Sequence, residues 1–202
     1  MKHLNQLLLA GCAALVFAGC ASAPSKFYTL NATAARTEQP AASFGVLVGP
    51  VTVPTAVDRP QMVWTTGPNK VEIAEFNRWA SPLADNIARA VAGDLGNQLG
   101  SLRVAVAPMP NFGPAYQVAI QVEQFESYPG DGKTAGEARL NVFWTLRSPS
   151  GGIAGSGVFA WNETAPGGNV EALVAAHSRI LEKLSASITA GIQQAVDGKN
   201  TN

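Results

Sequence analysis

Alternation of apolar and polar residues marks two segments in the second half of the chain. In residues 116–128 the alternation runs from Tyr116 to Val122, and in residues 137–147 apolar side chains occupy every second position with mostly polar side chains between them. A third segment, residues 153–163, follows the turn sequence Ser-Pro-Ser-Gly-Gly at 148–152. A period of two is typical of strands with one covered face and one wetter face. We therefore predict that the three segments form an antiparallel meander.

Helical spacing appears first between Leu83 and Leu99, where Leu, Ile or Val recurs every fourth residue. This period predicts an amphipathic helix. Ser81 is a favourable N-cap and Pro82 a favourable first helical residue. Gly100 is placed to end the helix.

A longer helical pattern fills the C-terminal part of the chain. Asn169 is expected to cap this helix and Gly198 to end it. Its apolar stripe consists of Leu173, His177, Ile180, Leu181, Leu184, Ile188 and Ile192. Such a stripe predicts a helix that buries one face against the rest of the domain.

The first half of the chain supplies further strands. Residues 44–53 are almost continuously apolar and predict a buried strand, in which Pro50 indicates a bulge or an edge. Residues 62–66 and 70–74 flank Thr-Gly-Pro-Asn and predict a hairpin, and residues 103–107 predict a short strand. The elements together predict a single domain of the α/β (α+β-like) class. We expect a mixed sheet with an antiparallel meander and two main helices packed on it.

The N-terminal end has the pattern of an export signal with a lipid-attachment site. Lys2 and His3 precede the apolar residues 7–17, and small residues then lead to Cys20. A charged start, a short apolar core and a small-residue exit describe a secretory signal that is too short to span a bilayer comfortably. A cysteine at the exit indicates a lipoprotein, because two or more acyl chains there give stable anchoring. Cys12 is the alternative attachment site, but it leaves an apolar core too short for export.

We therefore divide the chain into three parts. Residues 1–19 are predicted to be a lipoprotein signal peptide, residues 20–43 the lipidated cysteine and a tether, and residues 44–198 the folded domain. Within the tether, residues 27–30 (Phe-Tyr-Thr-Leu) suit a short strand or a docking segment. Ala21 follows the cysteine, and by the sorting convention of many Gram-negative bacteria the lack of Asp there favours the outer membrane.

Composition then narrows the range of functions. Fourteen Lys and Arg residues balance fourteen Asp and Glu residues, so the basic excess typical of a nucleic-acid-binding protein is missing. No cysteine follows Cys20, which excludes disulfides and cysteine-based metal sites in the mature chain. His177 is the only histidine left, and its place on an apolar stripe favours a hydrogen-bonded core residue over a catalytic one. We expect no enzyme, no metal and no cofactor.

Residues 130–134, Gly-Asp-Gly-Lys-Thr, end like a phosphate-binding loop. That loop needs a first glycine where this chain has Ser127, and it must lead into a helix. Here the segment joins two predicted antiparallel strands. A hairpin loop is therefore the better interpretation.

Two stretches before the first helix, residues 58–61 and 76–79, combine charge, rigid turns and aromatic rings. Arg and Trp are frequent anchors at protein interfaces. Trp79 can equally pack beneath the helix, with Arg59 or Arg78 satisfying backbone carbonyls. Both interpretations stay open for the candidate partner-binding residues Asp58, Arg59, Pro60, Gln61, Arg78 and Trp79.

These stretches also carry a resemblance to a known family. The lipoprotein signal is followed in order by residues 27–30, 48–54 (Val-Gly-Pro-Val-Thr-Val-Pro), 58–63 (Asp-Arg-Pro-Gln-Met-Val) and 78–83 (Arg-Trp-Ala-Ser-Pro-Leu). This ordered set resembles the PqiC (YmbA) family of auxiliary lipoproteins, which serve ABC-type and MCE intermembrane transport systems. The order of the predicted elements fits that family through to the C-terminus.

The resemblance implies an outer-membrane lipoprotein that faces the periplasm and docks the far end of an MCE-protein tube. Lipid would move through that assembly, which supports envelope integrity, and copies of the family could assemble as rings. The implied partners are an MCE-domain protein, the outer membrane and a second copy of the chain. Two other classes stay open: an assembly lipoprotein that plugs a β-barrel, and a periplasmic lipid-binding module with its own pocket.

Overall fold

The computed structural model describes residues 23–38, 42–131 and 133–200 of the chain. Within these residues the chain forms eight strands and two helices. In chain order the elements are β1 (Lys26–Tyr28), β2 (Gly45–Thr52), β3 (Gln61–Gly67), β4 (Lys70–Trp79), α2 (Leu83–Gln98), β5 (Val104–Val106), β6 (Ala115–Tyr128), β7 (Gly136–Arg147), β8 (Ile153–Ala165) and α3 (Val170–Asn200).

Five strands form the large sheet, in the order β5-β2-β6-β7-β8. Strands β6, β7 and β8 pair antiparallel, which confirms the predicted meander. Strand β2 pairs parallel with both β5 and β6, so the sheet is mixed. The pairing of β2 with β6 is shifted between Val48 and Val51, and this irregularity confirms the bulge predicted at Pro50.

The other three strands form a small sheet in the order β1-β4-β3. Strands β3 and β4 are the predicted hairpin, and β1 adds in parallel to the outer side of β4. The sequence predicted the α/β class and the single mixed domain, and both are confirmed. The division of the strands into two sheets is a detail that the hydrophobic pattern did not indicate.

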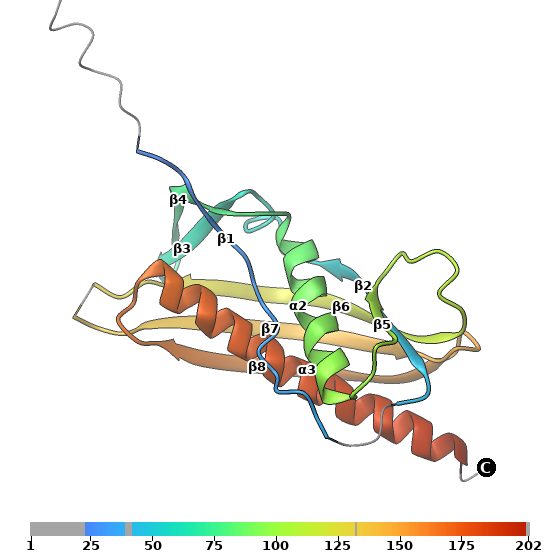
Figure 1. Ribbon diagram of the computed structural model, residues 1–202. Coiled ribbons are helices and arrows are strands. Elements are labelled where there is room, and N and C mark those ends of the chain that lie inside the picture. The colour runs from blue at the N-terminus through green and yellow to red at the C-terminus, as the bar shows by residue number, and fades with distance from the viewer. Residues whose placement is uncertain (1–22, 39–41, 132, 201–202) are drawn as a thin grey trace, which may run out of the picture.

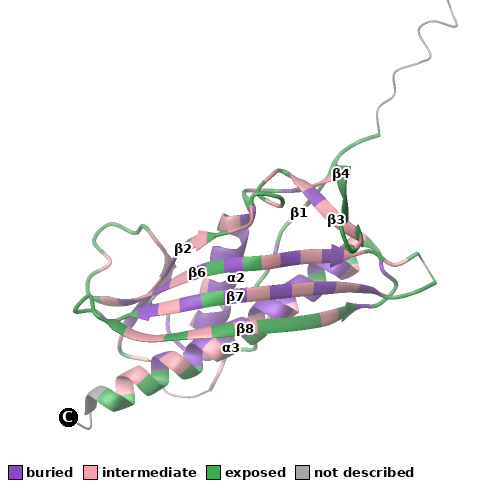
Figure 2. Ribbon diagram, turned by 180° about the vertical axis from the view of Figure 1, so that it is seen from behind, coloured by how far each residue is buried: buried purple, intermediate pink, exposed green. Residues whose placement is uncertain are grey.

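Helices α2 and α3 lie side by side on one face of the large sheet, while no helix covers its opposite face in the described chain (Figures 1 and 2). Alternate residues of β6 and β7 are buried beneath the helices. Every residue of the predicted α3 stripe is buried, which confirms the interpretation of that pattern. The core therefore lies between the two helices and the sheet.

The helix ends depart from the prediction at two points. Pro82, rather than Ser81, is the N-cap of α2, and its carbonyl accepts the first helical hydrogen bond from Asn86 N at 3.0 Å. Helix α3 runs through Gly198 to Asn200, because a glycine inside a helix weakens it without forcing its end. The other two predictions are confirmed. Gly100 has a positive φ of 61° beyond α2, and the Asn169 side chain caps α3 by accepting from Ala172 N at 2.8 Å.

Candidate functional site

The two stretches singled out in the sequence come together where the small sheet meets α2. Gln61 and Arg78 are register partners, and Trp79 N donates to the Pro60 carbonyl at 2.7 Å. Residues 58–60 and 79–82 line a hollow of about 360 Å³ at this junction. The fold thus places the candidate partner-binding residues in one region, although they are separated by seventeen positions and more in the chain.

Trp79 is part of the core. Only 5% of its surface is exposed, and its ring meets Phe125 edge-on at 6.0 Å between centroids. Phe125 in turn stacks on the His177 ring at 3.9 Å, with 7° between the ring planes. The indole therefore helps to hold the small sheet against the large one, and little of it is left for a partner.

The neighbouring charged residues are more accessible. Asp58 and Pro60 are exposed, while Arg59, Gln61 and Arg78 are half-buried. Arg78 Nε donates to the Glu75 carbonyl at 3.2 Å, as expected if the role of this arginine is to satisfy a backbone carbonyl. Arg59 Nε is shielded from solvent and has no hydrogen-bond partner among the described residues. Partner contact through these side chains stays a prediction.

The chain that leads towards Cys20 is built into the domain. We call residues 26–37 the strap. Its first part is β1, and Ala80 N donates to the Tyr28 carbonyl at 2.8 Å, just beyond the paired residues. Leu30 and Ala34 then bury their side chains against the domain. Within the predicted tether of residues 20–43, residues 26–37 therefore pack on the domain, whereas Cys20 and Cys12 lie outside the described residues.

Helix α2 holds the strap mainly through Asp94. The Asp94 Oδ1 atom accepts from Thr33 N at 2.7 Å and from Ala34 N at 2.8 Å. Asn97 extends the contact, because its side chain donates to the Ala34 carbonyl at 3.0 Å. At Gly93 the strap approaches so closely that an added Cβ would lie 2.7 Å from Ala32 Cβ. The helix surface is thus shaped to receive the strap.

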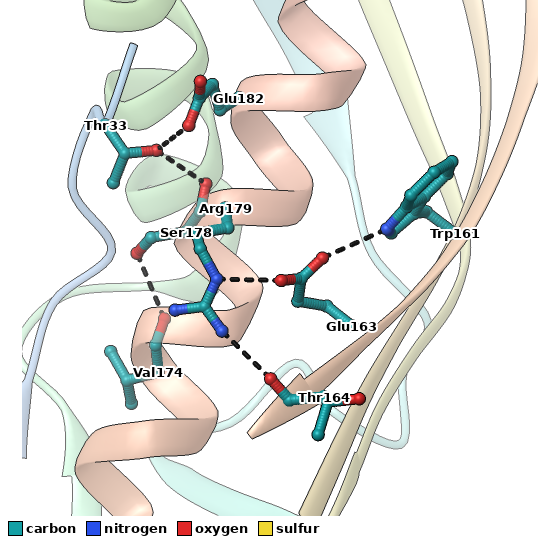
Figure 3. A network of polar contacts seen from close by, with 8 residues as sticks. All are labelled: Thr33, Trp161, Glu163, Thr164, Val174, Ser178, Arg179 and Glu182. Atoms are coloured by element: carbon teal, nitrogen blue, oxygen red, sulfur yellow. Dashed lines mark hydrogen bonds and ion pairs between the residues drawn. The ribbon is translucent and has the colours of Figure 1, made fainter. Parts of the chain in front are cut away.

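Helix α3 holds the other side of the strap (Figure 3). The Thr33 hydroxyl donates to Glu182 Oε2 at 2.7 Å, and Asn31 N donates to the Ser178 hydroxyl at 3.2 Å. The strap therefore bridges the two helices. Pulling on the N-terminal chain would load both helices together.

The electrostatics of Asp94 make this attachment unusual. Its side chain is buried, and burial raises the pKa of the carboxyl against the two backbone donors that lower it. The nearby Glu182 carboxylate raises that pKa further. The Oδ2 atom has no hydrogen-bond partner among the described residues. Asp94 is the residue that sequence reasoning missed; a carboxylate on the apolar side of a helix, beside Gly93, was the available signal.

A second polar group ties α3 to the edge strand β8 (Figure 3). Arg179 Nε meets Glu163 Oε1 at 2.9 Å, and Arg179 Nη2 donates to the Thr164 carbonyl at 3.0 Å. Trp161 Nε1 donates to the other oxygen of Glu163 at 3.1 Å. Partial burial opposes ionisation of Glu163, but these donors lower its pKa on balance. The network joins helix α3 to strand β8 at the surface and does not enclose a pocket.

His177 is the core histidine that the sequence predicted. It is 1% exposed, and its Nε2 lies 2.9 Å from the Ser127 hydroxyl. Burial lowers the pKa of the imidazole to about 3, so the ring is neutral at physiological pH. Within the described chain, no three side chains of the His, Cys, Asp or Glu types gather as metal ligands would.

The loop at residues 130–134 joins β6 to β7, which confirms the hairpin interpretation. Asp131 Oδ1 accepts from Lys133 N at 2.9 Å and from Thr134 N at 2.7 Å, so its carboxylate organises the turn. No helix follows the loop that could supply a dipole to a phosphate.

The larger hollows lie at the surface. One of about 660 Å³ lies between the strap and α3, and one of about 590 Å³ lies between the β3–β4 turn and Tyr128. The space between the large sheet and the helices is filled by apolar side chains, among them Leu146, Leu184 and Ile188. Among the described helices, neither has the length and hydropathy that a membrane span requires.

Known structures share this fold. Protein XCC0632 from Xanthomonas campestris matches with a TM-score of 0.70 at 17% identity, covering 88% of this chain and 100% of that chain. An uncharacterised protein of known crystal structure matches with a TM-score of 0.67 at 21% identity, covering 84% of this chain and 99% of that one. No curated protein matches the chain. At these identities the similarity establishes the fold alone.

The family comparison goes further. The family described as the ABC-type transport auxiliary lipoprotein component matches residues 28–189. This range covers most of the strap and every later element up to the last turns of α3. A transport component of this kind is not a class of enzymes. The chain belongs to the ABC-type transport auxiliary lipoprotein family.

Proposed function

We propose that this protein is an outer-membrane lipoprotein that serves an MCE-type intermembrane lipid transport system. It carries acyl chains on Cys20, faces the periplasm and docks the far end of an MCE-protein tube to the outer membrane. In this way it supports the integrity of the envelope. Its membership of a family of transport auxiliary lipoproteins supports the proposal at the coarser level.

The observation that carries the proposal is the strap. A lipoprotein whose lipid only concentrates an independent domain at a surface can use a free tether. Here the chain leading from the anchor is hydrogen-bonded to α2 through Asp94 and to α3 through Glu182 and Ser178. Such a connection passes force from the membrane directly to the core. It suits a protein that works by holding one end of a larger assembly.

The packing of the core favours docking over lipid carriage. A lipid-binding module needs an enclosed apolar space for an acyl chain. The face of the large sheet that the helices cover is instead filled with buried side chains. The hollow beside the strap is bordered by charged groups, including Glu171, Arg179 and Glu182.

Two surfaces are available for partners. The junction at residues 58–61 presents Asp58 and Pro60, which we assign to the MCE-domain protein. The uncovered face of the large sheet exposes Phe143 and its register partner Val158, at 42% and 73%. We assign that face to contact with further copies of this chain.

The anchor is tested by fractionation of cell membranes. We expect Cys20→Ala to release the protein into the soluble periplasm, because no acyl chain then holds it. Cys12→Ala is the matched control and should leave the protein in the outer-membrane fraction. Undiminished pelleting of the Cys20→Ala variant would overturn the proposed attachment site, and release by Cys12→Ala alone would move it to Cys12.

A further inference from the structure

Two exposed phenylalanines lie on the neighbouring strands β1 and β4, where the strap begins. Phe27 on β1 is 65% exposed, and Phe76 on β4 is 44% exposed. Phe27 is the register partner of Arg78, two positions after Phe76, so the two rings belong to adjacent strands. Rings left this open to water lose hydrophobic stabilisation that contact with an apolar phase would restore.

The length of the chain limits how far these rings can be from lipid. Seven peptide units separate Cys20 from Phe27, and a fully extended chain spans at most about 3.6 Å per residue, or about 25 Å here. If Cys20 carries acyl chains, Phe27 therefore stays within that distance of the membrane surface. The inference rests in this respect on the proposed function.

The shape of the molecule points the same way. The described chain begins at the end of the domain where β1 and β4 lie, and the C-terminal end of α3 is at the opposite end (Figure 1). Two other exposed apolar side chains lie outside the small sheet: Leu102 follows α2, and Ile153 begins β8, with exposures of 87% and 71%. Val71 and Ile73 are exposed on β4 as well, at 57% and 44%, so the apolar surface of the small sheet extends beyond the two rings.

The charges around the pair favour an apolar contact over an electrostatic one. Two basic residues are close to the rings: Lys26 precedes Phe27, and Arg78 is its register partner. One acidic residue, Glu75, precedes Phe76. Farther along β4, Lys70 and Glu72 neutralise each other in an ion pair of 2.7 Å. With so little net charge, attraction to anionic lipid would be weak and would be screened by salt.

We propose that Phe27 and Phe76 enter the interface of the bilayer that holds the acyl chains. The small sheet then rests on the membrane, and the end of the domain that carries the C-terminus of α3 points away from it. Aromatic rings are well suited to this shallow position, where apolar tails meet polar headgroups. The contact fixes the orientation of the domain, which the acyl chains alone would leave free.

The test uses single cysteines in the full-length lipidated protein. Since Cys20 is acylated and Cys12 leaves with the signal, an introduced cysteine is the only free thiol of the mature chain. Phe27→Cys and Phe76→Cys are labelled with an environment-sensitive fluorophore, and Leu102→Cys is the exposed control. The proteins are reconstituted in phosphatidylcholine vesicles, with or without phosphatidylglycerol, that contain lipids bearing a nitroxide quencher high on the acyl chain.

We expect several-fold stronger quenching at positions 27 and 76 than at position 102, in both kinds of vesicle and at low and high salt. Equal quenching at the three positions, while the protein still floats with the vesicles, would overturn the inference and leave the anchor intact. Quenching that appears only with phosphatidylglycerol would overturn the apolar mode of contact. Failure of the lipidated protein to float would overturn the proposed anchor, and the inference with it.

Discussion

At the scale of single residues, a series of ring contacts joins the two sheets to α3. Trp79 meets Phe125 edge-on, and Phe125 stacks on His177, whose ring reaches Ser127. The sequence indicated a buried His177 because of its place on the helical stripe. It left Trp79 undecided, because a Trp before a helix has the same local pattern whether it packs inward or meets a partner. The contact with Phe125, from a distant strand, shows that Trp79 packs inward.

The neutral His177 makes the stability of the domain depend on pH. Its native pKa is about 3, whereas an unfolded histidine has a pKa of about 6.5, so acid protonates the unfolded chain first. Stability is then lost as the pH falls from about 6.5 towards 3, by about 2 kcal/mol between pH 7 and pH 5. We expect His177→Gln to remove this part of the pH dependence, as measured by urea unfolding at several pH values.

Ser127→Ala is the control for that comparison. It removes the hydroxyl that faces the imidazole but leaves the titrating ring, so most of the pH dependence should remain. The slope of stability against pH is the readout, because either variant can change stability at neutral pH through packing. Identical slopes for wild type and His177→Gln would contradict the account of the buried neutral ring.

At the scale of elements, the strands and helices with strong periodicity were predictable and the strap was not. The meander, the β3–β4 hairpin and both helices follow from local patterns of two and of three to four residues. The strap is rich in Ala and Thr, small residues that are also common in flexible linkers. Its order comes from Gly93 and Asp94, some sixty residues later in the chain, and such a distant acceptor leaves no local signal.

Asp94 should therefore control whether the strap stays on the domain. Asp94→Ala leaves Thr33 N and Ala34 N without their acceptor, which we expect to cost about 1–3 kcal/mol. Asp94→Asn keeps an acceptor oxygen and removes the buried negative charge of a carboxyl whose pKa is raised by burial. This variant should therefore be at least as stable as wild type near neutral pH. Urea unfolding and amide exchange at Thr33 and Ala34 measure the two effects.

The sign of the charge effect supports that comparison. A carboxyl whose native pKa is raised is destabilising once it ionises, so its cost appears as the pH rises above the unfolded value of about 3.9. The advantage of Asp94→Asn over wild type should accordingly shrink in acid. Rapid exchange at both amides in Asp94→Asn, as fast as in Asp94→Ala, would show that the hydrogen bonds to Oδ1 do not hold the strap.

At the scale of the whole molecule, the domain has two distinct ends and one uncovered face. The strap begins at one end and α3 finishes at the other, while the helices occupy a single side of the large sheet (Figure 1). The class of fold and the family were predictable, since each depends on local or ordered features; the predicted signal lies outside the described residues. The separate small sheet and the course of the strap beside it depend on pairings between distant strands, such as β1 with β4.

The central claim is that this lipoprotein holds an MCE-domain protein at the outer membrane. The most direct measurement is affinity capture of the tagged protein from the outer-membrane fraction of cells that carry the whole transport operon, with the captured proteins identified by mass spectrometry. The account predicts that an MCE-domain protein is recovered with the wild-type chain. Recovery of the lipidated protein from that fraction without any MCE-domain protein would contradict it.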